Sequence, residues 1–104
     1  MTPAMIAATR RLIGLTVDQL AAALGVNPRT VRGWESGRYS PSDGPVQDLL
    51  RLRGEHDAEA DALTDAARDG EAITLPSGPR PQGWYLALAA RVLDREPGAG
   101  IDWR

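Results

Sequence analysis

The sequence contains no cysteine, which excludes disulfide bonds and cysteine-based metal sites. Its single histidine, His56, has no further ligand type at a useful spacing, so we expect no metal site and no cofactor. The lack of a recognisable pocket motif among the carboxylates also argues against an enzyme. No apolar run approaches the length of a membrane span and no signal peptide starts the chain, so we expect a cytoplasmic protein. Lysine is absent too, which is typical of a GC-rich genome and says little about chemistry.

The charged residues are unevenly distributed along the chain. The formal net charge of the 104 residues is −2, which by itself argues against a nucleic-acid partner. Residues 1–40, however, hold five arginines against two carboxylates, a net charge of +3, whereas residues 41–70 have a net charge of −5. Affinity for DNA depends on the local potential at the phosphates, so a basic N-terminal part on an acidic body is compatible with DNA binding.

One stretch in the first half of the chain carries the start and stop signals of two short helices. Thr16 and Gln19 have the T-x-x-Q spacing of a capping box. Gly25 favours the left-handed backbone that ends a helix. Asn27 is a good N-cap and Pro28 suits the first helical position, so a second helix begins at once. Two short helices joined by a tight glycine turn predict a helix-turn-helix.

This stretch resembles the Cro/phage-repressor type of DNA-binding domain, the Xre-like superfamily. The resemblance covers about residues 4–53 and implies a lambda-repressor-like helix bundle. Arg10 matches an arginine that the family often pairs with the glutamate of a Trp-Glu pair. The sequence departs at Val17, where the family commonly has a glutamine that contacts the DNA backbone. The residues that carry the resemblance are Leu15-Thr16, Ala21, Gly25-Val26, Val31, Trp34-Glu35 and Gly37.

The second helix of such a motif lies in the major groove, where its N-terminal half reaches the base edges. Arg29 and Arg32 share a face of that helix, and each side chain has the fork that bonds a guanine O6 and N7. Trp34 and Glu35 are expected to hold the helix on its domain, and Asn27 mainly to cap it. The other predicted DNA contacts, to phosphates or to a thymine methyl group, are Thr16, Gln19, Asn27, Thr30, Arg38 and Tyr39.

The rest of the chain predicts a mainly α fold with a helix-turn-helix domain over residues 1–53 and a smaller helical and short-strand region over 54–104. Further helices are expected from Thr2-Pro3 to about Ile13, from Pro45 to about Arg68 with a possible kink at Gly54, and over 84–93. Short strands are expected over 72–76 and 101–104, side by side. Val46, Leu49, Leu50 and Leu52 should close the core of the first domain.

The second half of the chain predicts a dimerisation region. The acidic residues beyond 54 are interpreted as a solvated helix face, while the helix over 84–93 is apolar nearly all round. A helix of that kind should be buried from two sides, by its own chain and by a second copy, because water penalises a large exposed apolar patch. The residues expected in the interface are Leu63, Trp84, Tyr85, Leu88, Ala89 and Val92.

The C-terminal pattern also resembles the small regulators related to anti-CRISPR-associated autorepressors. The matching element is Trp84-Tyr85-x-x-x-Ala-x-x-Val-Leu, which in that group belongs to a dimerisation region. The resemblance implies a homodimer on an inverted repeat. One recognition helix reads only a few base pairs, which independently favours two copies related by a two-fold axis.

These observations favour a sequence-specific transcriptional repressor that binds double-stranded DNA and controls its own operon. A second hypothesis is the antitoxin of a toxin–antitoxin pair, which a neighbouring toxin gene would favour. A third is a protein-interaction adaptor that has lost DNA binding. Loss of Arg29, Arg32 and Arg38 would have indicated an adaptor, and all three are present.

Overall fold

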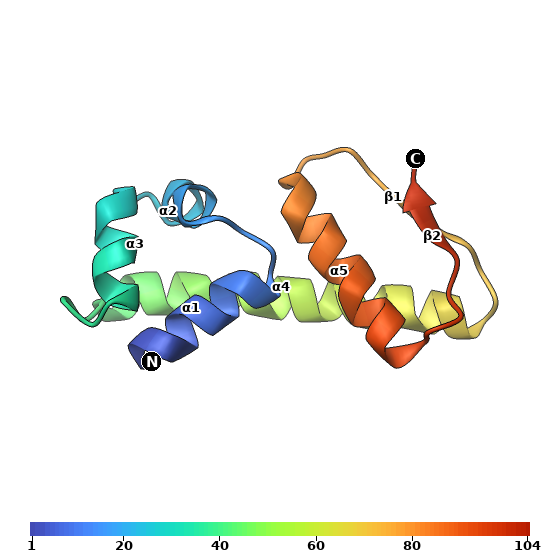
Figure 1. Ribbon diagram of the computed structural model, residues 1–104, viewed down its shortest axis with the longest axis horizontal. Coiled ribbons are helices and arrows are strands. Elements are labelled where there is room, and N and C mark those ends of the chain that lie inside the picture. Colours follow the sequence, from blue (N-terminus) through green and yellow to red (C-terminus); the bar gives the residue numbers. More distant parts are fainter. The chain divides into compact units, whose positions relative to one another are not determined.

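The computed structural model describes every residue from Met1 to Arg104 and is mainly α-helical, which confirms the predicted fold class (Figure 1). The elements in chain order are α1 (Pro3–Leu12), α2 (Val17–Leu24), α3 (Pro28–Glu35), α4 (Asp43–Arg68), β1 (Ile73–Leu75), α5 (Gln82–Arg95) and β2 (Ile101–Trp103). The chain divides into two compact units, an N-terminal unit (Met1–Arg53) and a C-terminal unit (Gly54–Arg104), and α4 contributes to both. None of the helices is both long and apolar enough to cross a membrane.

The first three helices begin and end where local sequence signals predict. The hydroxyl of Thr2 accepts a hydrogen bond from the Met5 N–H at 3.1 Å and caps α1. Gly25 has a φ of 68°, in the left-handed region, and ends α2. Asn27 caps α3 and Pro28 is its first residue. These short helices are therefore fixed at their ends by residues within a few positions in the sequence.

The core of the N-terminal unit is built from all four of its helices. Ile6, Ile13, Leu20 and Val31 are at most 1% exposed. From α4, Leu49 and Leu52 close this core as predicted, and Val46 is half-buried.

Two expectations for α4 are wrong in detail. Leu50 is 45% exposed, because its neighbours Leu49 and Leu52 already define the buried face of the helix. The helix also begins at Asp43 rather than at Pro45. Proline is tolerated throughout the first helical turn, where no intrahelical bond needs its missing N–H.

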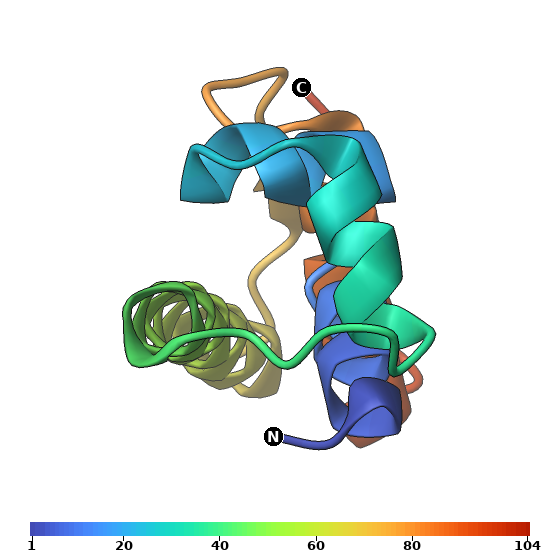
Figure 2. The ribbon, with the colours of Figure 1, turned by 90° about the vertical axis from the view of Figure 1, so that its left-hand side faces the viewer.

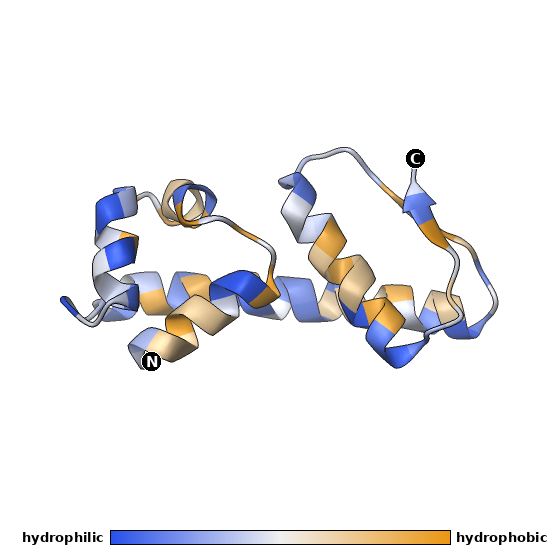
Figure 3. Cartoon of the chain, in the orientation of Figure 1, coloured by the Kyte–Doolittle hydropathy of each residue, from blue (hydrophilic) through white to orange (hydrophobic).

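The C-terminal unit combines the second part of α4 with α5 and a two-stranded parallel sheet. The strands pair in the register Ile73↔Ile101 and Leu75↔Trp103, and α5 forms the crossover between them. A hydrophobic band runs along α5 (Figure 3). Ile73 and Leu75 are at most 6% exposed, whereas Thr74 between them is exposed, so the sheet buries one face.

The side chains that were expected to meet a second copy are mostly covered by their own chain. Trp84 and Val92 are 0% exposed and Leu88 is 2% exposed; Tyr85 and Ala89 are also buried, and Leu63 is half-buried. Apart from half-buried Leu63, these side chains therefore form the core of the C-terminal unit in a single chain. The apolar run of α5 has its own partner within one chain, a long-range pairing that periodicity alone does not show.

The acidic residues of α4 in the C-terminal unit are not simply a solvated face, since arginines and a tryptophan contact them. Arg95 Nη1 lies 2.8 Å from Asp61 Oδ1, and Arg91 Nη2 lies 2.7 Å from Asp57 Oδ1. The Trp84 indole donates to Glu59 Oε2 at 2.9 Å. Two further pairs join Arg80 to Glu55 and Arg68 to Glu96. Most of these carboxylates are exposed, as a solvated face predicts, but their contacts also tie α4 to the C-terminal part of the chain.

His56 lies at the centre of this network and is fully buried. Its Nδ1 lies 3.0 Å from Arg91 Nη1 and its Nε2 lies 3.1 Å from the Trp84 carbonyl oxygen. Arginine only donates and a carbonyl only accepts, so the ring is the neutral tautomer with its proton on Nε2. Burial lowers the pKa of His56, and the nearby Arg91 lowers it further.

Candidate nucleic-acid interface

One face of α3 fixes it to the N-terminal unit. Val31 is 0% and Trp34 is 5% exposed on that face. At the end of the helix, Arg10 and Glu35 form a bidentate ion pair, in which Arg10 Nε lies 2.7 Å from Glu35 Oε2 and Arg10 Nη2 lies 2.8 Å from Glu35 Oε1. The hydrogen bonds to Glu35 raise the pKa of Arg10. The predicted Arg10–Glu35 contact is confirmed, and α3 is held rigidly by its most recognisable residues.

The other face of α3 is polar and exposed, and the helix stands at the near side of the N-terminal unit in Figure 2. Arg29 and Arg32 lie on it about one helical turn apart. Arg32 Nη2 is 3.5 Å from Asp18 Oδ1, and the two side chains are 62% and 73% exposed. A pair this exposed contributes at most about 1 kcal/mol. Arg32 can therefore leave Asp18 for a better acceptor.

A shallow hollow gathers these two arginines with the residues that follow the helix. It is lined by Arg29, Arg32, Gly33, Ser36, Arg38 and Tyr39. Three guanidinium groups and no carboxylate face it, so the local field favours an anion. Four of the predicted DNA contacts, which lie up to ten positions apart in the sequence, are thus brought to one place.

The remaining predicted contacts hold the ends of α2 and α3. Thr16 and Gln19 form the reciprocal capping box, with N···O distances of 3.1 and 3.0 Å. The Asn27 side-chain oxygen accepts the Arg29 N–H at 2.9 Å. These caps use the amide oxygens, so the NH2 groups of Gln19 and Asn27 remain available as donors. Thr30 is half-buried in the first turn of α3.

Gly33 and Ser36 are the lining residues that sequence reasoning missed, and Gly33 has the clearer structural role. It is buried in the middle of α3, where glycine costs about 1 kcal/mol relative to alanine. A Cβ at this position would overlap Cδ2 and Cε2 of the Tyr39 ring. The signal in the sequence was a glycine inside a helix without a turn to explain it, which indicates a close packing contact.

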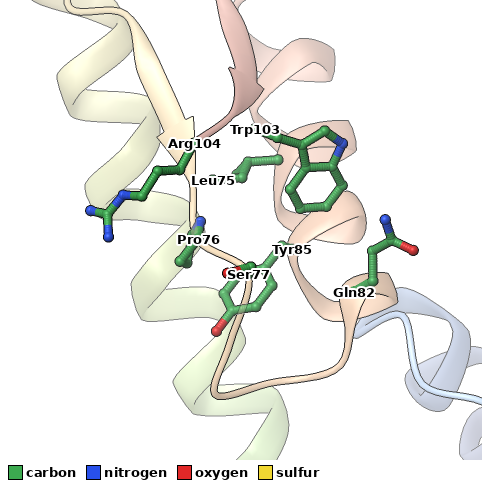
Figure 4. A pocket seen from close by; sticks show the side chains of 7 residues that line it. All are labelled: Leu75, Pro76, Ser77, Gln82, Tyr85, Trp103 and Arg104. Carbon is green, nitrogen blue, oxygen red and sulfur yellow. The ribbon is translucent and has the colours of Figure 1, made fainter.

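A second hollow, of about 340 Å³, lies in the C-terminal unit (Figure 4). Its walls are Leu75, Pro76, Ser77, Gln82, Tyr85, Trp103 and Arg104. The Tyr85 hydroxyl accepts the Arg80 backbone N–H at 3.0 Å. Arg104 extends away from the other labelled side chains in Figure 4.

Comparison with known protein families agrees with the geometry of the N-terminal unit. Residues 6–52, slightly less than half of the chain, match the model of a helix-turn-helix family. The match spans from Ile6 of α1 to Leu52 of α4, and so includes α3 and its arginines. It supports a DNA-binding regulator of the Cro/C1 type. No curated protein matches the chain.

Proposed function

We propose that the protein is a sequence-specific transcriptional regulator that inserts α3 into the major groove of DNA. The observation that carries the proposal is the hollow beside α3, which is lined by three arginines and no carboxylate, on a helix anchored by the Arg10–Glu35 ion pair. Arg29 and Arg32 would each pair with the O6 and N7 of a guanine, and such a pair discriminates by about 1–3 kcal/mol against a wrong base.

Contacts to the DNA backbone would set the register of α3 in the groove. The positive ends of the α2 and α3 helix dipoles attract phosphate, and the NH2 groups of Gln19 and Asn27 lie at these ends. Thr16 and Thr30 add hydroxyl groups nearby. Arg38 follows α3 directly and would reach a phosphate beside the bases that the helix reads, and Tyr39 lies next to Arg38 at this edge of the hollow.

The distribution of charge supports DNA as the partner. The N-terminal unit has a net charge of +3 and the C-terminal unit one of −5. A positive unit attracts the phosphates, and an acidic unit on the same chain disfavours weak binding to arbitrary sequences. We infer that the acidic unit raises selectivity by lowering non-specific affinity.

The proposed functional form is a homodimer on an inverted repeat. Two copies related by a two-fold axis would place two α3 helices in half-sites about 34–36 Å apart, one turn of DNA. The core residues of α5 are used within the chain, so the interface is assigned to its exposed stripe. Leu86 and Leu93 are 48% and 41% exposed, and with exposed Ala90 they share one face of the helix.

Occupancy of an inverted repeat that overlaps the protein's own promoter would block transcription, so we propose an autorepressor in the cytoplasm. The test is a binding-site selection with the full-length protein, followed by a mobility-shift assay on its own upstream DNA. We expect an enriched inverted repeat and a shift at nanomolar protein concentration in moderate salt. The proposal fails if no sequence is enriched and the upstream DNA does not shift.

The dimer is tested separately by sedimentation of variants in the exposed stripe. Leu86→Glu with Leu93→Glu should give a monomer that binds the full repeat more weakly but keeps its affinity for one half-site. Leu50→Glu is the matched control, because Leu50 is equally exposed but belongs to the N-terminal unit. A stripe variant that stays dimeric would contradict this assignment of the interface.

A further inference from the structure

The loop after α3 is seated on the helix at one point. Gly33 has no side chain, and the Tyr39 ring occupies the space that a Cβ would fill. The Tyr39 N–H also donates to the Gly33 carbonyl oxygen at 3.1 Å. Both the backbone and the ring of Tyr39 are therefore fixed to the middle of α3, although Tyr39 lies outside the helix.

The same ring also lies close to an arginine. Arg38 Cζ lies 5.6 Å from the centre of the Tyr39 ring, within range of a cation–π contact. Tyr39 is 48% exposed, so the ring is not needed to fill the core. The ring packs on Gly33 and lies within cation–π range of Arg38, and all three residues line the hollow with Arg29 and Arg32.

We propose that Tyr39 is a positioning residue whose ring, seated on Gly33, holds Arg38 at the edge of the α3 hollow for contact with a DNA phosphate. The inference rests on the proposed function and deepens it, because it makes a loop arginine part of the rigid surface of the reading helix. An exposed arginine on a free loop samples many rotamers, whereas one stacked on an anchored ring is preorganised for binding. Gly33 is then required for DNA affinity although it has no side chain to contact DNA.

The experiment measures the affinity of the full-length protein for its selected DNA site over a range of salt concentrations. The variants are Arg38→Ala, Tyr39→Ala, the double variant, Tyr39→Phe and Gly33→Ala. Tyr39→Ala should weaken binding about two- to fivefold, the range of an exposed cation–π contact. Arg38→Ala should lower the salt slope by about 1. Tyr39 acts through Arg38, so the double variant should bind no more weakly than Arg38→Ala alone.

The two remaining variants distinguish the role of the Tyr39 ring from that of its hydroxyl group and from an effect on folding. Tyr39→Phe keeps the ring and should bind like the wild type, whereas a direct phosphate contact by the hydroxyl would make it as weak as Tyr39→Ala. Gly33→Ala gains helix propensity but must displace the Tyr39 ring, so it should melt near the wild-type temperature yet bind DNA like Tyr39→Ala. This combination of unchanged stability and reduced affinity is not expected from a merely structural glycine.

The inference is overturned by additive losses in the double variant, by a weak Tyr39→Phe, or by wild-type affinity in Gly33→Ala. These results leave the proposed function standing, since the wild type still selects and binds its site. A wild type that selects no DNA sequence would overturn both. If Tyr39→Ala fails to fold, Gly33→Ala and Tyr39→Phe decide the question without it.

Discussion

The two units use the same residue type in opposite ways. In the N-terminal unit, Arg29, Arg32 and Arg38 line one exposed hollow, and only Arg32 has a carboxylate nearby, at 3.5 Å. In the C-terminal unit, the arginines of α5 lie 2.7–2.8 Å from carboxylates of α4. Arginine thus presents charge to a partner in one unit and joins secondary-structure elements in the other.

This difference explains why the net charge of −2 says little about the partner of the chain. Arginines that are paired within the fold contribute little to the potential outside it, because a nearby carboxylate cancels their field. The exposed arginines beside α3 are not cancelled in this way. Local pairing, and not the sum of charges, decides which surface attracts an anion.

The largest effect is expected where the C-terminal unit depends on its core. Trp84 is 0% exposed, and the centre of its ring lies 4.6 Å from that of the His56 ring in an edge-on arrangement. Its indole N–H donates to the Glu59 carboxylate. Trp84→Ala should lower the free energy of unfolding by about 3–5 kcal/mol, measured by urea denaturation followed by helicity. Trp84→Phe keeps an aromatic ring and should cost less, about 1–2 kcal/mol. A Trp84→Ala protein as stable as the wild type would contradict the assignment of this side chain to the core.

A smaller loss is expected from the one strong ion pair of the N-terminal unit. Arg10→Ala strands the Glu35 carboxylate, whose side chain is 14% exposed, and should cost about 2–3 kcal/mol of unfolding free energy. Glu35→Ala in the same protein should restore part of the loss. Base preference in a binding-site selection should stay unchanged, because the pair anchors α3 without facing the hollow. A changed base preference in an Arg10→Ala protein of wild-type stability would mean that Arg10 contributes to base recognition instead.

The smallest effect concerns pH. Because the pKa of His56 is lowered by folding from about 6.5, the unfolded chain takes up the proton first as the pH falls. The free energy of unfolding should be constant above a pH of about 6.5. At lower pH it should decrease by at most about 1.4 kcal/mol per pH unit, until the pH passes the lowered pKa of the folded state. His56 is the only histidine, so His56→Gln should abolish this slope in melting experiments between pH 5 and 7.5. An identical slope in the variant would assign the proton uptake to carboxylates.

Local signals in the sequence predicted most of the N-terminal unit. Caps such as Thr16 and Asn27 act on N–H groups two or three positions away, so their effect can be read from neighbouring residues. The Arg10–Glu35 pair lies 25 positions apart and was predicted only because the family resemblance supplied it.

Long-range contacts of the C-terminal unit could not be predicted in the same way. The Arg91–His56 contact spans 35 positions and depends on how α5 packs on α4. Without that packing, an apolar helix and an acidic helix indicate a dimer interface and a solvated face. The packing of Tyr39 on Gly33 also escaped prediction, because the need for a glycine is visible only when the group that fills the space of its missing side chain is known.

The central claim is that the arginines of the N-terminal unit, and not those of the C-terminal unit, meet DNA. The most direct measurement is the salt dependence of binding to the selected site. Arg29→Gln, Arg32→Gln and Arg38→Gln should each weaken binding, and loss of a phosphate contact should lower the slope by about 1. Arg80→Gln and Arg95→Gln remove the same charge from the C-terminal unit and should leave affinity and slope unchanged. Equal losses from both sets would contradict the account.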